Sequence, residues 1–257
     1  MSQKDLPGKL QGSQQDAWQS LKAFTRARIA LGRTGTALPM QQWLQFKMAH
    51  AYARDAVYSA LEVDNLVTAL QGAALPVLLL HSKVAGRDQY LQRPDLGRRL
   101  HEDAEDKLKA LSGERYDIAI VIADGLSATA INHHAATLVN ELAPLLKEKG
   151  FHLAPVTVVQ QARVAISDDI GALLNARLVL LLIGERPGLS SPDSMGAYIT
   201  YQPAPGLTDE SRNCISNIRP EGLAISLAVQ KIMYLVTESL RLKLSGVNLK
   251  DEGGLLQ

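Results

Sequence analysis

The second half of the chain alternates between continuous apolar runs and segments with helical periodicity. Three runs, Asp117–Ala123, Ala154–Gln160 and Leu178–Ile183, are rich in β-branched and aliphatic residues, as strands buried on both faces of a sheet are. A short helix is expected between the second and third runs, with Ser167 as its N-cap. Between the first and second runs, apolar residues recur at helical spacing: Ile131, Ala135, Leu138, Leu142 and Leu145.

The pattern before Tyr116 is mainly helical. Two runs with helical character, Ala17–Leu31 and Pro39–Leu61, are separated by a glycine-containing loop. A further helix is expected to begin at Pro94 and to end at Gly113. Two weaker patterns indicate extended segments at Pro76–Leu80 and Ala197–Tyr201, and a long helix at about Ala224–Leu244 closes the chain.

Strands that alternate with helices indicate a parallel sheet with helical crossovers. The predicted fold class is therefore α/β, with a Rossmann-like sheet in the C-terminal part and a mainly helical region before it. We divide the chain into a polar flexible leader (residues 1–16), a mainly helical region suited to subunit docking (17–114) and an α/β domain (115–257).

Composition narrows the class of protein. Hydrophobic residues make up 46% of the 257 residues and charged residues 21%, with a net charge of +1, so no nucleic-acid or membrane partner is indicated. Aromatic residues are only 5%, which argues against a stacking platform for single strands. A single cysteine, Cys214, fits a reducing compartment, and the polar start lacks an apolar signal core. The composition predicts a soluble cytoplasmic protein.

The sequence lacks the motifs that mark several common kinds of binding and catalytic site. The first strand is not followed by a dinucleotide-binding glycine motif, and Gly32–Gly35 lacks the lysine and hydroxyl of a phosphate loop. None of the six histidines pairs with another at metal-ligand helical spacing, and the adjacent His133 and His134 are expected to diverge on a helix. A Ser-His-Asp site is left open, although no nucleophile-elbow motif is present. We predict no catalytic and no metal-ligating residue in this chain.

The carboxyl ends of the predicted strands form the candidate site, because ligands of open parallel sheets bind there. Three loops leave these ends, at Asp124–Ser127, Gln161–Ser167 and Gly184–Pro192. Glu185 in the third loop has two interpretations: an ion pair with its neighbour Arg186, or an acceptor for a ligand's donors.

Three further residues have structural explanations. Helix capping accounts for Asp124 and Ser127, and a lone cysteine such as Cys214 is most often a small buried residue. We place Cys214 in a loop between the sheet and the last helix. From the residues alone, the chain is an α/β binder of an unidentified ligand.

A series of short motifs resembles the small chain of ethanolamine ammonia-lyase. The resemblance runs in order and with similar spacing from about Arg26 to Asn248. Each motif is weak alone, and chance agreement of the whole series is implausible. The motifs are Arg93–Leu100, Asp124–Ser127, Arg163-Val164, Asp169–Gly171, Val179–Leu189 and Cys214–Ile218, with a weaker match at Ala27–Ile29 and Gly32–Gly35.

The resemblance implies a heteromeric, adenosylcobalamin-dependent ammonia-lyase. Its large subunit carries the substrate site, and residues 115–257 of this chain form a cobalamin-binding domain with Val164, Glu185 and Cys214 as cofactor contacts. Val164 is expected to meet the face of the corrin ring, Glu185 to accept from its amides, and Cys214 to act as a contact rather than a nucleophile. Because Asp-x-His-x-x-Gly is absent, the cofactor's own base is expected to stay on cobalt.

Other interpretations stay open beside this one. A stand-alone nucleotide-dependent enzyme predicts a glycine-rich first turn, which is absent. A structural partner that touches no cofactor predicts that Glu185 and Cys214 tolerate substitution. The resemblance adds a bacterial microcompartment as an alternative to the open cytoplasm, although some relatives carry packaging extensions longer than the leader before Ala17.

Overall fold

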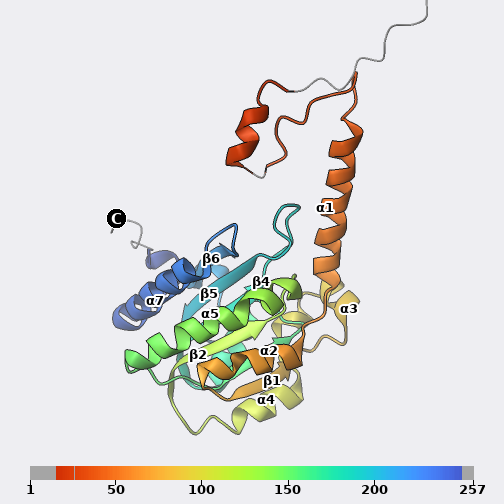
Figure 1. The fold of residues 1–257 in the computed structure, drawn as a ribbon. Helices are drawn as coiled ribbons and strands as arrows, with labels where there is room; N and C mark the ends of the chain where they lie inside the picture. Colours follow the sequence, from red (N-terminus) through yellow and green to blue (C-terminus); the bar gives the residue numbers. More distant parts are fainter. Residues whose placement is uncertain (1–15, 26, 251–257) are drawn as a thin grey trace, which may run out of the picture.

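The computed structural model describes residues 16–25 and 27–250 as a three-layer α/β body with a projecting N-terminal segment (Figure 1). The predicted leader, residues 1–16, lies outside the described residues except for Asp16. The strands are β1 (Val77–His81), β2 (Tyr116–Ala123), β3 (Val156–Gln160), β4 (Ala176–Gly184), β5 (Met195–Tyr201) and β6 (Arg212–Ile218). The α-helices are α1 (Met40–Tyr58), α2 (Val63–Ala69), α3 (Arg87–Gln92), α4 (Glu102–Lys109), α5 (Ala128–Glu148), α6 (Ile166–Leu173) and α7 (Ile225–Leu242). Short 3₁₀ turns are η1 (Gln19–Phe24), η2 (Leu70–Ala73), η3 (Leu96–Arg98), η4 (Asp209–Ser211) and η5 (Gly246–Asn248).

The strands form one mixed sheet in the order β1-β3-β2-β4-β5-β6. The first four strands in that order are parallel, and β5 and β6 are added as antiparallel strands beside β4. The predicted α/β class and its parallel sheet with helical crossovers are confirmed. β1 comes from the mainly helical region before residue 115, so the sheet draws strands from both sides of that position.

Alternate residues of β2 and β4 serve two separate cores, which explains why both strands are continuously apolar. Ile118, Ile120 and Ile122 pack on one face under α2, α5 and α7. Ala119, Val121 and Ala123 pack on the other face against α4 and α6. Each strand therefore buries both sides, as parallel strands covered by helices do.

An N-terminal arm projects from this body. We call residues 16–25 and 27–58 the arm; it consists of η1, a connecting segment that folds back, and α1, which rises from the edge of the body in Figure 1. Only Ala49 and Ala56 of α1 are buried. No helix in the described part of the chain combines the length and apolarity needed to cross a bilayer.

Several predicted elements match the structure closely. The five proposed strands lie within two residues of β1 to β5 at each end, and Ser127 caps α5 by accepting a hydrogen bond from the Ala130 amide at 3.3 Å. The closing helix is α7, and the long helix between the first two buried runs is α5.

Four predicted local features are wrong. A helix over Ala17–Leu31 is reduced to η1, and the helix expected from Pro94 begins only at α4, whose N-cap is His101. Ser167 does not cap α6; the cap position is Ala165, and the Ser167 hydroxyl donates to the Val164 carbonyl at 2.8 Å. Cys214 lies on strand β6 rather than in a loop.

Candidate functional site

A buried carboxylate organises the carboxyl end of the parallel strands. Asp124, directly after β2, is 3% exposed and accepts the backbone N–H groups of Gly125, Gln161 and Ala162 at 2.9, 2.9 and 3.0 Å. Burial raises the pKa of Asp124, and these hydrogen bonds oppose the rise. Asp124 thus joins the loop after β2 to the loop after β3. The prediction that it caps a helix is wrong.

The loop after β2 also lies unusually close to the end of β4. A Cβ atom placed on Gly125 would come within 2.2 Å of the Gly184 carbonyl oxygen, and one on Gly184 within 2.0 Å of the Ser127 carbonyl oxygen. The Leu126 amide donates to the Gly184 carbonyl at 2.9 Å in this contact. Glycine is needed here because two backbones approach each other without room for a side chain.

Two adjoining hollows open along this edge, and we call them together the sheet-edge recess. The first is about 380 Å³ and includes Glu185 in its wall; the second is about 640 Å³ and includes Cys214. Both are lined by Arg163, Val164 and Tyr198, so one ligand could contact both. The structure therefore places all three predicted contact residues, Val164, Glu185 and Cys214, on one recess.

Val164 stands at the junction of the two hollows, supported by a stack of side chains. Its neighbour Arg163 lies over the ring of Tyr90, with Cζ 4.1 Å from the ring centroid, and donates from Nη2 to the Tyr90 carbonyl at 3.1 Å. The Tyr90 hydroxyl donates to the Ala162 carbonyl at 3.0 Å. Arg163 Nε is buried and has no acceptor among the described residues, so it is a free donor in the recess wall.

Glu185 is half-buried and held at one oxygen. Its Oε2 accepts hydrogen bonds from the Ser194 hydroxyl and from the Asn217 amide, the latter at 3.1 Å. Among the described residues, no donor is bonded to Oε1. The carboxylate is therefore oriented by the protein and keeps one oxygen for a further donor, whereas the predicted alternative of an ion pair with Arg186 is not formed.

Cys214 is an exposed residue on β6, opposite Tyr198 of β5 in the sheet register. The prediction that it is a small buried residue is wrong. Surrounding protein atoms nevertheless displace enough water to raise the pKa of the thiol, with the Tyr198 hydroxyl acting in the opposite sense. A thiol with a raised pKa is a poor nucleophile near neutral pH, which fits a neutral contact surface.

A buried ion pair supports the strand that carries Cys214. Arg212 donates to Asp168 of α6, and both side chains are 1% exposed. Burial raises the pKa of Asp168 to about 6, against the attraction of Arg212. The pair fixes the start of β6 against α6, close to the wall of the second hollow.

Sequence reasoning missed part of the recess. Arg163, Tyr90, Tyr198 and Arg212 had no role in the prediction, although Arg163 belongs to the same motif as Val164. A signal was present for Tyr198, because it is a partly buried aromatic residue between the buried Ala197 and Ile199 in the predicted strand. Tyr90 and Arg212 reach the recess only through folding.

One arginine connects the recess to the arm. Arg87 of α3 donates from Nε to the Val57 carbonyl, in the last turn of α1, at 2.6 Å. It also donates from Nη1 to the Gly125 carbonyl at 2.9 Å and lies 3.8 Å from Asp124. The base of the arm and the turn after β2 are therefore held by the same guanidinium group.

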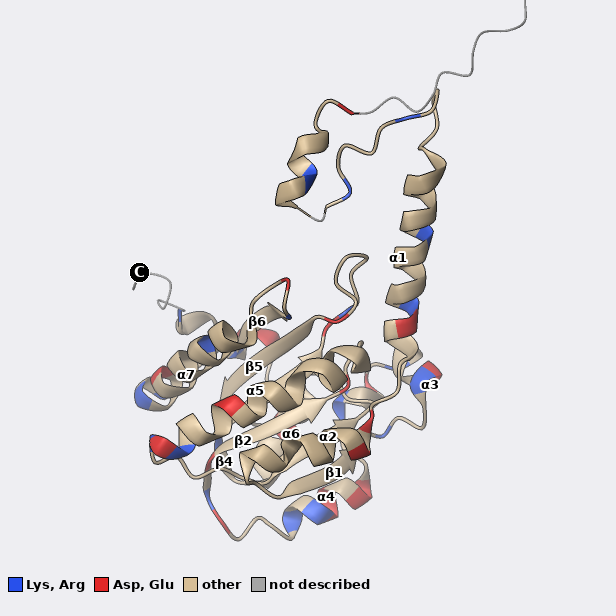
Figure 2. Ribbon diagram, in the orientation of Figure 1, with Lys and Arg blue, Asp and Glu red and all other residues tan. Residues whose placement is uncertain are grey.

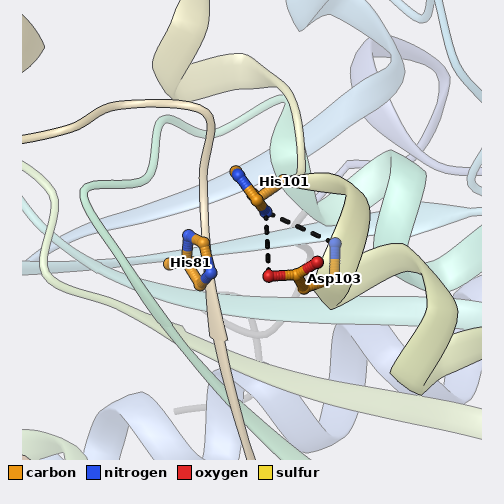
Figure 3. Close-up of side chains that lie close together, drawn as sticks. All are labelled: His81, His101 and Asp103. Carbon is orange, nitrogen blue, oxygen red and sulfur yellow. Dashed lines mark hydrogen bonds and ion pairs between the residues drawn. The ribbon is translucent and has the colours of Figure 1, made fainter.

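Two histidine clusters lie outside the recess. His81 at the end of β1 and His101 have ring centroids 4.5 Å apart, with Asp103 beside them (Figure 3). His101 Nδ1 accepts from the Asp103 amide at 3.3 Å and lies 3.6 Å from the Asp103 carboxylate, so this ring serves as the N-cap of α4. His81 and His101 come from different elements, so helical spacing along one segment could not predict that they meet.

The second cluster corrects a prediction about neighbouring histidines. His133 and His134 do not diverge: their ring centroids are 5.8 Å apart, and His134 Nε2 lies 3.6 Å from Asp193. Burial lowers the pKa of His134, while Asp193 opposes this shift. A buried imidazole with a lowered pKa is neutral at physiological pH.

Comparison with known proteins identifies related chains. The family model for the ethanolamine ammonia-lyase light chain matches residues 15–250. An ethanolamine ammonia-lyase small subunit from Xanthomonas campestris pv. campestris (strain ATCC 33913) is 54% identical over 240 residues, which cover 92% of this chain and 88% of the relative. The small subunit from Azotobacter vinelandii is 52% identical over 241 residues (93% and 89%), and that from Pseudomonas putida (strain GB-1) is 52% identical over 238 residues (91% and 88%).

Proposed function

Because this chain belongs to the family of ethanolamine ammonia-lyase light chains, we propose that its sheet-edge recess holds part of the adenosylcobalamin used by that enzyme. Family membership makes the chain the small subunit of a carbon–nitrogen lyase that converts ethanolamine to acetaldehyde and ammonia, with a large subunit as its partner. The adenosylcobalamin, when bound, supplies the radical chemistry by homolysis of its cobalt–carbon bond.

The residues of the recess suit a corrin ring. A corrin is broad, with apolar faces and amide groups at its periphery, and it needs a wide surface with scattered polar partners. The recess offers two adjoining hollows of about 380 and 640 Å³, which share Val164 and Tyr198 as apolar walls. Arg163 Nε is a buried donor without an acceptor in the described residues, and Glu185 Oε1 is an acceptor without a bound donor.

Each proposed contact has a distinct role. Val164 packs against the ring, and Glu185 accepts from a peripheral amide N–H through Oε1 while Ser194 and the Asn217 amide hold Oε2. Cys214 provides a neutral sulfur surface, in keeping with the raised pKa of its thiol. These residues bind and orient the cofactor, and we assign no proton or bond-breaking step to them. The substrate site belongs to the large subunit.

The observation that carries the proposal is the meeting of Val164, Glu185 and Cys214, from three separate loops and strands, on one recess at the carboxyl ends of the parallel strands. A first experiment measures acetaldehyde formed from ethanolamine and adenosylcobalamin by the matching large subunit, with and without this chain. Turnover should appear only when the chain is added. A soluble, associated complex without turnover would contradict the assignment.

The role of Glu185 is tested by cofactor affinity in the assembled complex. Glu185→Ala should raise the Kd for adenosylcobalamin by roughly 10-fold, since a charge-assisted hydrogen bond is lost. Glu148→Ala is the matched control, because Glu148 is an exposed carboxylate at the far end of α5 and should leave the Kd unchanged. Equal affinities for the two variants would favour a small subunit that stabilises its partner without touching the cofactor.

We also propose a cytoplasmic location for the complex. The chain's single cysteine is a free thiol, in keeping with a reducing compartment. Fractionation of cells that express the chain from its own genome should recover it with the large subunit in the cytoplasmic fraction.

A further inference from the structure

The arm exposes more large apolar side chains than the rest of the described protein. Both tryptophans of the chain are among them, and Phe24 is 85% exposed. The set comprises Trp18, Leu21, Phe24, Leu38, Met40, Trp43, Leu44, Phe46, Met48, Tyr52 and Tyr58. A concentration of this kind on one segment marks an interaction surface, whereas single exposed apolar residues elsewhere do not.

Helix α1 is apolar on more than one side. Met40, Leu44, Met48 and Tyr52 recur every four residues along one stripe, and Trp43 and Phe46 lie outside that stripe. Polar residues lie between these apolar side chains, so α1 has a mixed surface. Because only Ala49 and Ala56 are buried, its exposed aromatic and aliphatic side chains are available to a partner.

The charges on the arm all have one sign over most of its length. Residues 17–54 include Lys22, Arg26, Arg28, Arg33, Lys47 and Arg54, and no aspartate or glutamate. Figure 2 shows α1 as mainly uncharged with bands of basic residues, and acidic colour only at its base. Lys47 lies over the ring of Trp43, with Nζ 4.2 Å from the ring centroid, so a cation and an aromatic ring form one patch. A partner for this surface needs an apolar groove edged by carboxylates.

The arm is hydrogen-bonded near the sheet-edge recess at two points. Arg28 donates to the carbonyl of Leu189, in the loop that follows Glu185, at 3.3 Å. At the other end of α1, Arg87 links the Val57 carbonyl to the Gly125 carbonyl beside Asp124. The arm is therefore anchored to the loop after β4 and to the turn after β2, both at the carboxyl ends of the strands.

We propose that the arm is the surface by which this chain docks on the large subunit, through an apolar groove of that subunit bordered by acidic residues. This inference rests on the proposed function in one respect: the same partner that covers the arm also closes over the cofactor recess. Family membership supplies the partner, since a small subunit implies a large one. The apolar and basic character of the arm defines what the contact surface of that partner must provide.

A pair of matched leucines tests the proposal. Leu44 on α1 is 53% exposed and Leu227 on α7 is 48% exposed, so replacing either by aspartate disturbs a solvent-facing helix position. The Kd between the purified large subunit and each full-length variant is measured by sedimentation without added cofactor. Leu44→Asp should weaken the association by roughly 30-fold or more, and Leu227→Asp by less than roughly 3-fold.

Further variants separate weakened association from misfolding of the chain. Trp43→Ala removes an exposed ring without adding a charge and should weaken association in the same way, with an unchanged circular dichroism spectrum. Lys47→Glu should weaken association more than Lys47→Gln, because an acidic partner repels the new carboxylate. Arm variants that bind the large subunit as tightly as Leu227→Asp does would overturn the proposal. So would self-association of the chain that Leu44→Asp abolishes while affinity for the large subunit is unchanged.

A loss of docking through the arm can be distinguished from a loss of cofactor binding in the recess. At saturating concentrations of an arm variant, turnover and the Kd for adenosylcobalamin should return to wild-type values, because only assembly is weakened. Glu185→Ala should show the opposite pattern, with normal assembly and weaker cofactor binding. If Glu185→Ala leaves cofactor binding unchanged while arm variants still lose the large subunit, the cofactor proposal fails and the docking proposal stands.

Discussion

At the scale of single residues, Asp124 shows how one side chain can set the shape of a binding edge. Its carboxylate accepts three backbone N–H groups, two of them from the loop after β3, and brings that loop beside the turn after β2. The sequence places an acidic residue after a buried strand, a pattern equally typical of a helix cap. Its partners Gln161 and Ala162 lie far along the chain, so the local pattern could not reveal the actual role.

His134 makes stability depend on pH. Burial lowers its pKa in the folded state, so below pH 6.5 the unfolded chain binds this proton more readily than the folded chain does. The neutral imidazole therefore stabilises the fold above about pH 6.5, and this stabilisation is lost as the pH falls through the lowered folded-state pKa. Urea unfolding at a series of pH values should show a steeper loss of stability on acidification for the wild type than for His134→Gln.

The control for this measurement is the neighbouring histidine. His133 is exposed on the same helix and close to His134, so His133→Gln removes a neighbouring imidazole while keeping the buried one. Its stability should keep nearly the wild-type dependence on pH. A His134→Gln variant with the same pH dependence as the wild type would exclude His134 as the source.

The three contact residues were predicted in two different ways. Val164 and Glu185 follow buried strands, so the rule that ligands bind at strand carboxyl ends already indicated their loops. Cys214 was assigned only through the resemblance, because it lies on β6, a strand that the sequence reasoning did not predict. Tyr90 and Arg212 could not be predicted, since they reach the site through packing of distant elements.

At the scale of elements, the buried parallel strands were predictable and the edge strand β6 was not. β2 and β4 are continuous apolar runs because both faces are covered. In β6 the buried residues are Arg212, Ile215 and Ile218, three apart, and the pairing with β5 shifts register between Met195 and Ala197. A bulge and one charged core residue remove the period of two by which strands are recognised.

The helix expected over Ala17–Leu31 illustrates the opposite error. Its composition suits a helix, yet only Gln19–Phe24 forms a short 3₁₀ turn, and none of these residues is buried. Most helix stability in proteins comes from packing of an apolar face rather than from intrinsic preference. Gln19–Phe24 has no packed face here and forms only a 3₁₀ turn, whereas the 19-residue helix α1 forms with only Ala49 and Ala56 buried.

The close approach of the loop after β2 to the end of β4 gives a prediction for Gly184. In Gly184→Ala, the new Cβ would lie 2.0 Å from the Ser127 carbonyl oxygen, and a backbone must shift to accommodate it. We expect a loss of about 3 kcal/mol in the free energy of unfolding, measured by urea denaturation. Gly113→Ala is the control, because no atom lies within 4 Å of its Cβ position. Equal unfolding midpoints for the two variants would contradict the close contact.

At the scale of the whole molecule, the chain divides into a body that is stable by its own packing and an arm that is not. The body has a core on each face of its sheet, and the continuous apolar runs of the sequence were sufficient to predict this layering. The arm was predicted only as helical and suited to docking. Its position beside the recess follows from two hydrogen bonds, from Arg28 and from Arg87, that join residues far apart in the sequence.

The excess of basic residues on the arm should affect the speed at which two subunits find each other. Residues 17–54 contain six cations and no aspartate or glutamate, and their field reaches about one Debye length, near 10 Å at 0.1 M salt and about 3 Å at 1 M. Raising the salt concentration from about 0.05 to about 0.5 M should slow association with the large subunit roughly ten-fold and leave dissociation nearly unchanged. Stopped-flow mixing measures both rates, and an association rate independent of salt would show that encounter is guided by the apolar surface alone. If association slows with salt as expected, newly made chains in a cell would be drawn to the large subunit by attraction at a distance as well as by chance collision.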